Sequence, residues 1–248
     1  MNHLKTVIYD EEAGRAEGFD DLLRELASKG VAAVRSDRAG EIVSDSTLFI
    51  CGSEKTCSIA EKSNTAFVTY MIDPRGSQCV IEGFFEVTSD FCERMLMRKL
   101  RRPWIIAMTD RLVIREFKED DVTDVFDDRW GEAGFIREYI DFQYHLFGYG
   151  IWALETRQDK KIIGKAGLFN SSSHDGIELG YEIAEPYRQR GYAFEACSAI
   201  CRYAESELEA HRLYVTTTPD NIASKRLAAK LKNAENVDII VSLDYTHH

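Results

Sequence analysis

The residues best suited to chemistry lie in one short loop, Arg188–Ala193, which reads Arg-Gln-Arg-Gly-Tyr-Ala. A predicted strand, Ile177–Ala184, precedes this loop, and apolar residues recur at helical spacing over Ala193–Leu208. The start of a helix offers unpaired backbone N–H groups and the positive end of the helix dipole. Gly191 lets a ligand approach the backbone closely, and two arginines add positive charge. The loop is therefore predicted to bind a phosphate or pyrophosphate. It does not fit a P-loop, because no Gly-Lys-Ser or Gly-Lys-Thr follows.

A second strand-to-helix junction follows about thirty residues further along the chain. The predicted strand Leu213–Thr218 leads into a segment that contains Asn221 and Ser224, and Leu227 and Leu231 then fall on one helix face. Asn221 fits an ordinary helix N-cap as well as a ligand contact. Two such junctions in succession favour a ligand-binding site over a chance occurrence of glycine and arginine in one loop.

Both junctions belong to a C-terminal half with its own order of elements. The predicted order is a strand, two helices, three strands, a helix, a strand, a helix and a strand. The elements ahead of the phosphate-binding junction are Leu112–Phe117, a helix opened by Glu119–Asp121, Phe135–Phe147, Ile151–Thr156 and Lys161–Phe169.

The first hundred residues instead alternate strands with single helices. This alternation predicts a doubly wound, mostly parallel α/β sheet. Pro103 cannot continue a helix, so the sequence predicts an N-terminal Rossmann-like domain over 1–104 and a second domain over 109–248. The predicted strands are Leu4–Tyr9, Val31–Val34, Thr47–Cys51, Ala66–Met71 and Val80–Phe85, and the predicted helices are Phe19–Lys29, Glu54–Lys62 and Ser89–Leu100.

Composition narrows the function classes. The chain has 248 residues, a net charge of −11 and a pI near 5.1, which argue against a nucleic-acid surface and favour a cationic acceptor. Apolar runs fall well short of the roughly 18 residues that a membrane span needs, so no membrane partner is expected. The first ten residues carry no leader signature, and a cytoplasmic location is expected. The six cysteines and six histidines show no metal-ligand spacing, so no metal is expected.

The motifs resemble those of one known family. The strand end Glu178–Tyr181 followed by Arg188-x-x-Gly191-x-Ala193 resembles the acetyl-CoA pyrophosphate loop of the GNAT N-acetyltransferase superfamily. Asn221-x-x-Ser224 resembles the asparagine-led start of the helix that flanks coenzyme A in that superfamily.

Further segments resemble one branch of the superfamily. Thr109–Arg115, Trp152 and Ile163–Gly167 are similar to the branch that includes the ribosomal-protein N-terminal acetyltransferases. The resemblance covers about residues 109–235 and implies a mixed α+β domain with a central, mostly antiparallel sheet. It also implies acetyl-CoA as co-substrate.

The resemblance assigns roles to particular residues. The strand before the loop is expected to separate from its neighbour and to pair with the pantetheine arm through Glu182, Ile183 and Ala184. Glu178 is the candidate general base from its own place at the head of the strand Ile177–Ala184, and an exposed strand glutamate without a chemical task is the alternative. Glu182, on the same face of that strand, is a weaker candidate. The remaining coenzyme contacts implied are Arg188, Gln189, Arg190, Gly191, Tyr192, Ala193, Asn221 and Ser224.

The sequence departs from the family at two places. Ala228 occupies the position where many members carry the tyrosine general acid, which leaves solvent or another tyrosine such as Tyr181 to protonate the thiolate. After Asn233 there is room for one strand, Val237–Leu243, instead of a terminal pair. The acceptor site is then either open, or completed by the N-terminal domain or by a second subunit in a homodimer.

These observations predict an N-acetyltransferase that transfers acetyl from acetyl-CoA to a primary amine by direct attack in a ternary complex. The acceptor is an amine-bearing small molecule or a protein N-terminus. One alternative is a coenzyme-A-binding regulatory or scaffolding protein whose chemistry has decayed. A weaker alternative is a phosphatase, because Asp10 and Glu12 after the first strand faintly resemble the start of haloacid-dehalogenase-like hydrolases.

Overall fold

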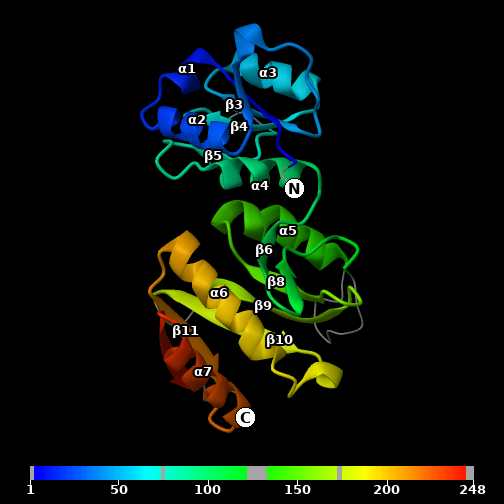
Figure 1. Ribbon diagram of the computed structural model, residues 1–248, viewed down its shortest axis with the longest axis vertical. Helices are drawn as coiled ribbons and strands as arrows, with labels where there is room; N and C mark the ends of the chain where they lie inside the picture. Colours follow the sequence, from blue (N-terminus) through cyan, green and yellow to red (C-terminus); the bar gives the residue numbers. More distant parts are fainter. Residues whose placement is uncertain (1–2, 74–75, 122–132, 172–174, 244–248) are drawn as a thin grey trace. The chain divides into compact units, whose positions relative to one another are not determined.

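The computed structural model describes residues 3–73, 76–121, 133–171 and 175–243 (Figure 1). The chain divides into two compact units, Met1–Trp104 and Ile105–His248. Each unit has its own hydrophobic core. The two are described separately below.

The N-terminal unit is a parallel sheet with helices on both faces. Its five strands lie in the order β2-β1-β3-β4-β5, and every adjacent pair is parallel. Helices α2 and α4 pack on one face and α3 on the other, so the predicted doubly wound parallel sheet is confirmed. The elements are β1 (Thr6–Tyr9), α1 (Glu11–Gly14), α2 (Phe19–Ser28), β2 (Ala32–Arg35), η1 (Ser36–Arg38), β3 (Thr47–Cys51), α3 (Glu54–Lys62), β4 (Ala66–Tyr70), β5 (Val80–Ile81) and α4 (Ser89–Lys99).

The C-terminal unit is built on a seven-stranded mixed sheet in the order β12-β11-β10-β9-β8-β7-β6. Neighbours from β6 to β10 are antiparallel, and β10, β11 and β12 are parallel, as expected for a mostly antiparallel central sheet. The elements are β6 (Ile105–Met108), β7 (Leu112–Arg115), α5 (Ala133–Phe147), β8 (Ile151–Thr156), β9 (Ile162–Asn170), β10 (Ile177–Ile183), η3 (Glu185–Tyr187), α6 (Tyr192–Leu208), β11 (Arg212–Thr217), α7 (Ile222–Ala234) and β12 (Asp238–Leu243).

Two helices bury one face of this sheet. Helix α6, drawn in orange-yellow in Figure 1, lies across the strands with α7 beside it. Its face carrying Ala196, Cys197 and Ile200 is buried against inward side chains of the strands, such as Trp152 and Leu179. Helix α5 instead packs on Ala153 and Phe117, whose side chains form a separate small core.

Strands β10 and β11 separate soon after they begin. They pair only at Ile177 with Leu213 and at Glu178 with Tyr214. On its other side, β10 pairs with β9 over its whole length. Beyond Glu178, the edge of β10 that faces β11 therefore has no strand partner, and a cleft opens between the two strands.

The structure differs from the expected elements at two places. Ile105–Met108, predicted to lie in the junction, is an edge strand because a tight turn at Asp110 folds it antiparallel to β7. The expected strand Val80–Phe85 is a strand only at Val80–Ile81. The helix expected after Glu119–Asp121 falls on residues 122–132, outside the described residues.

Candidate functional site

The loop between β10 and α6 has the backbone shape of an anion-binding turn. Gln189 (φ 60°) and Gly191 (φ 83°) both adopt the left-handed conformation, so the loop is folded tightly before α6 begins at Tyr192. Gly191 is the N-cap of α6, and among the described residues no side chain caps this helix start. The first amides of α6 are therefore available to an anionic ligand.

A cleft of about 580 Å³ lies over this loop, between β10, α6 and α7. Its walls include aromatic and aliphatic side chains that the sequence analysis did not select: Tyr187, Phe194 and Leu227. The selected residues that line the cleft are Glu182, Ile183, Arg188, Gln189, Gly191, Tyr192, Ala193, Asn221 and Ser224. Such a cleft, apolar along its length and cationic at the loop, suits a long ligand with a phosphate group.

Two selected residues, Ala184 and Arg190, do not line this cleft. The Ala184 amide donates to the Ile163 carbonyl of β9 at 2.9 Å, and its own carbonyl accepts from the Tyr187 amide at 2.9 Å. In an antiparallel pair, successive residues point their backbone groups to alternate sides. With Ala184 facing β9, the backbone groups of Tyr181 and Ile183 face the cleft instead. Tyr181 also lines the cleft. The sequence analysis named it only as a possible acid, although its place two residues before Ile183 on the strand could have predicted this position.

Arg188 is exposed, but its guanidinium is tied to the strand. Its Nε donates to the Ile183 carbonyl at 2.8 Å. This contact leaves the rest of the guanidinium to a ligand and holds the loop against the end of β10. Arg190 is exposed, with its guanidinium carbon 5.8 Å from the centre of the Tyr187 ring.

A second cleft, of about 420 Å³, lies between β10 and β11 and contains Glu178. The Glu178 carboxylate is half-buried and accepts a hydrogen bond from the Ser171 hydroxyl at 3.0 Å. Tyr181, Asn221 and Ser224 line both clefts and so mark the point where the two meet. A ligand lying along the first cleft can thus reach a group held in the second.

Tyr181 has an environment that keeps its proton. Burial raises the pKa of Tyr181, and a hydrogen bond with the Ser224 hydroxyl lowers it only in part, so the pKa stays above the usual 10.0. Ser224 is placed by Asn221, whose side-chain oxygen accepts from the Ser224 amide at 3.0 Å as the N-cap of α7. Ala228 is buried one turn further along α7 and offers no proton.

Glu182, the weaker base candidate, is occupied by a cross-strand ion pair. Lys165 stands opposite it on β9, and its Nζ lies 3.0 Å from the Glu182 carboxylate. Glu182 therefore lines the first cleft as part of a neutralised pair.

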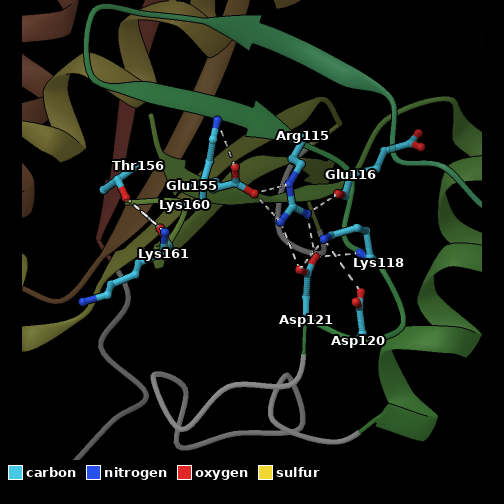
Figure 2. Close-up of polar contacts among 9 residues, drawn as sticks. All are labelled: Arg115, Glu116, Lys118, Asp120, Asp121, Glu155, Thr156, Lys160 and Lys161. Carbon is cyan, nitrogen blue, oxygen red and sulfur yellow. Dashed lines mark hydrogen bonds and ion pairs between the residues drawn. The ribbon is translucent and has the colours of Figure 1, made fainter. Parts of the chain in front are cut away.

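Arg115, the second arginine of the Thr109–Arg115 motif, is buried away from both clefts. Figure 2 shows its guanidinium between Asp121 and Glu155, with Nη2 2.9 Å from Asp121 Oδ1 and 2.7 Å from Glu155 Oε2. Burial lowers the pKa of Arg115, but its hydrogen bonds and charge pairs with the two carboxylates outweigh this and raise it. The cluster is structural: it ties the end of β7 to β8 and to the segment ending at Asp121.

In the N-terminal unit, Asp10 is used to hold strand ends together. It is 4% exposed and accepts from the Gly52 amide and the Ser53 hydroxyl, each at 2.9 Å, and from the Ala13 amide at 3.0 Å. These contacts cap α1 and connect the ends of β1 and β3.

In the described parts of the chain, no three His, Cys, Asp or Glu side chains are grouped to hold a metal ion. The described helices include none that is long and apolar enough to cross a bilayer.

Comparison with known protein families identifies the domain that contains both clefts. The model of the acetyltransferase (GNAT) domain matches residues 111–232, which include both clefts. Residues 111–232 are a GNAT acetyltransferase domain. The matched residues include Glu178, the loop Arg188–Ala193 and the Asn221 junction, and the match ends within α7.

Individual relatives match part of the GNAT domain. The uncharacterized N-acetyltransferase YnaD of Bacillus subtilis is 32% identical over 75 residues, which are 30% of this chain and 44% of the relative. The [ribosomal protein uS5]-alanine N-acetyltransferase of Escherichia coli is 32% identical over 100 residues, or 40% of this chain and 50% of that protein. The chain thus spans about half the length of these curated relatives.

Solved structures also resemble this half of the chain. An acetyltransferase from Agrobacterium tumefaciens is 23% identical, with a TM-score of 0.42, and the match covers 50% of this chain and 81% of that structure.

Proposed function

We propose that this protein is an N-acetyltransferase that uses acetyl-CoA to acetylate a primary amine in a ternary complex. The observation that carries the proposal is the meeting of two clefts at Tyr181, Asn221 and Ser224. One cleft ends at a cationic loop with free helix amides, and the other contains the Glu178 carboxylate. Direct transfer needs this arrangement, because donor and acceptor must reach the same point from different sides.

The first cleft suits coenzyme A along its whole length. The α6 amides and Arg188 would hold the pyrophosphate, and the left-handed Gly191 allows its close approach. The edge of β10 that faces the cleft would pair with the amide groups of the pantetheine arm through the backbone of Tyr181 and the Ile183 amide, since the Ile183 carbonyl already accepts from Arg188. Phe194 and Leu227 would cover its apolar parts.

Acetyl-CoA supplies the acetyl group as a thioester. Glu178 takes a proton from the acceptor nitrogen, directly or through a water, as that nitrogen forms its bond to the carbonyl carbon. Tyr181 returns a proton to sulfur as the carbon–sulfur bond breaks. Its raised pKa keeps it protonated at neutral pH, which suits an acid in the place of the tyrosine that Ala228 replaces.

The acceptor is proposed as an amine on a small molecule or a protein N-terminus. The relative from Escherichia coli is named for alanine of ribosomal protein uS5, which places an α-amino group among the acceptors to be tested. The net charge of −11 favours acceptors that carry positive charge.

A thiol-release assay with acetyl-CoA and an amine panel tests the proposal. The panel contains peptides beginning with alanine or serine, polyamines, amino acids and aminoglycosides. We expect free coenzyme A to appear with at least one amine class, together with the acetylated product by mass spectrometry. Acetyl-CoA binding by calorimetry without turnover on any amine would instead support the coenzyme-A-binding regulatory protein, which Ala228 already motivates.

A further inference from the structure

A clasp behind the loop Arg188–Ala193 joins Glu195 to Thr109 and Arg111, which lie 86 and 84 residues earlier in the chain. Glu195, in the first turn of α6, accepts from the Thr109 hydroxyl at 2.6 Å and from the Arg111 amide at 2.9 Å through one oxygen. Its other oxygen accepts from the Arg111 guanidinium, with Nε and Nη2 each at 2.6 Å. Both carboxylate oxygens are thus committed to the turn between β6 and β7.

Arg111 also contacts the loop itself. Its Nη1 donates to the Arg190 carbonyl at 2.9 Å, and its guanidinium carbon lies 4.3 Å from the centre of the Tyr192 ring. A Cβ atom added at Gly191 would lie 3.4 Å from Arg111 Nη2. One guanidinium therefore contacts the residues on both sides of Gly191, where the backbone is left-handed.

The turn that carries Arg111 is itself held in place. Arg157, after β8, donates from Nη1 to the Thr109 carbonyl at 2.9 Å, and its amide donates to the Arg111 carbonyl at 2.9 Å. The clasp thus connects the loop to the β8–β9 hairpin, and so to the main sheet.

The clasp also has an electrostatic consequence. Burial raises the pKa of Glu195, but hydrogen bonds from Thr109 and Arg111 outweigh it and leave the pKa below its usual 4.5. Glu195 is therefore ionised at neutral pH, one helical turn from the amides that would receive an anion. Its charge alone would repel a phosphate, and Arg111 neutralises it.

We propose that Arg111, together with Thr109 and Glu195, is a positioning residue that holds the loop Arg188–Ala193 in its anion-binding shape. This rests on the proposed function, since the anion is the pyrophosphate of coenzyme A. Arg111 acts through the Arg190 carbonyl and Glu195, not by transferring a proton. Its loss should therefore weaken coenzyme binding and leave the chemical step nearly unchanged.

The experiment measures coenzyme A binding by calorimetry in the full chain, with Arg111→Gln and Arg111→Lys variants. We expect the Kd to rise about tenfold or more in both, because charge-assisted hydrogen bonds are lost and lysine cannot make the forked contacts. At saturating acetyl-CoA, kcat should stay within about twofold, and the KM for acetyl-CoA should rise with the Kd. Arg202→Gln is the matched control, because Arg202 lies on the same helix and pairs with Glu235, remote from the loop.

A phosphate-free donor separates positioning from general damage. With S-acetylpantetheine, kcat/KM should be the same in the wild type and in the Arg111→Gln variant, since this donor never contacts the loop. Three outcomes would overturn the proposed role of the clasp: an equal loss of kcat/KM with both donors, wild-type affinity in the Arg111→Lys variant, or an unchanged Kd in both variants. If the wild type itself binds no coenzyme A, the proposed function fails, and the clasp fails with it.

Discussion

Glu178 stands where β10 leaves β11, with one side of its carboxylate held by the Ser171 hydroxyl. A glutamine there would keep the size of the side chain and accept the same hydrogen bond, but it would not take a proton. We expect Glu178→Gln to lower kcat by roughly 10²–10⁴-fold and to leave the Kd for acetyl-CoA within about twofold. The loss should shrink as pH rises, because the amine then loses its proton without help. Steady-state kinetics across a pH series, with calorimetry, measure both quantities.

Equal kcat in the Glu178→Gln variant and the wild type at neutral pH would demote Glu178 to an ordinary strand residue. Solvent or a group on the acceptor would then take the proton.

Tyr181 gives a second prediction, because its environment raises its pKa above 10.0. A group with a raised pKa keeps its proton as pH rises through the usual value. The wild-type rate should therefore not fall between neutral pH and pH 10.0 for want of the acid. Tyr181→Phe should lower kcat by about 10²-fold or more, at the low end of general acid–base effects. Steady-state kinetics on a real acceptor measure this loss.

A donor with a better leaving group tests the assignment of Tyr181. A thioester of an acidic aryl thiol needs little protonation, so Tyr181→Phe should slow its reaction less than that of acetyl-CoA. An equal loss with both donors would contradict a role as the acid and point to damage of the cleft.

At the scale of an element, the junction between β10 and α6 depends on a left-handed glycine. Gly191 has φ 83°, which a β-branched side chain adopts only with strain. Gly191→Val should distort the loop and abolish measurable binding of acetyl-CoA by calorimetry, while α6 itself remains packed on the sheet. Gly30→Val is the matched control: Gly30 has φ 72°, has open space around it and lies in the N-terminal unit. Unchanged affinity in the Gly191→Val variant would show that the loop is not the phosphate site.

The cleft beside this junction depends on how two strands separate. Strand β11 is fully paired with β12, whereas β10 keeps only its first two residues on β11. The backbone groups of Tyr181 and the amide of Ile183 are thereby left to a ligand at an otherwise internal position of the sheet, while the Ile183 carbonyl accepts from Arg188. An unpaired strand edge is stable there only because the cleft remains open to solvent or to a bound molecule.

At the scale of the whole molecule, both clefts lie within one of the two compact units. All residues lining the two clefts lie in the C-terminal unit, and Asp10 lies in the other. The buried carboxylate of Asp10 accepts hydrogen bonds from two amides and a hydroxyl. Asp10→Asn replaces it with a neutral amide and should lower the free energy of unfolding of the N-terminal unit by about 1–3 kcal/mol. Urea unfolding followed by circular dichroism measures this loss.

The same variant separates Asp10 from the proposed chemistry. Acetyl transfer by Asp10→Asn should stay within about twofold of the wild type. Asp45→Asn is the matched control, because Asp45 is exposed in the same unit. Hydrolysis of a general phosphate ester with magnesium that disappears in Asp10→Asn would contradict a structural role and revive the phosphatase alternative.

The sequence alone determined the features that depend on neighbouring residues. The alternation of strands and helices predicted the parallel sheet of the N-terminal unit, and the loop after Ile183 was selected because Gly191 and its arginines precede a helix. Both are properties of short windows, in which side-chain spacing and backbone preference act directly. Glu178 was selected the same way, from its place on a predicted strand.

Only the tertiary structure decided which groups face one another. The clasp joins Arg111 to Glu195 across 84 positions of chain, and the register of β9 turned the backbone of Ala184 away from the cleft while leaving that of Tyr181 toward it. Asp10 accepts hydrogen bonds from Gly52 and Ser53 because β1 and β3 are neighbours in the sheet. Contacts of this kind depend on strand register and on packing between distant segments, which local spacing does not encode. The physical reason is that a hydrogen bond reaches about 3 Å, so its partner is fixed only when the whole sheet is assembled.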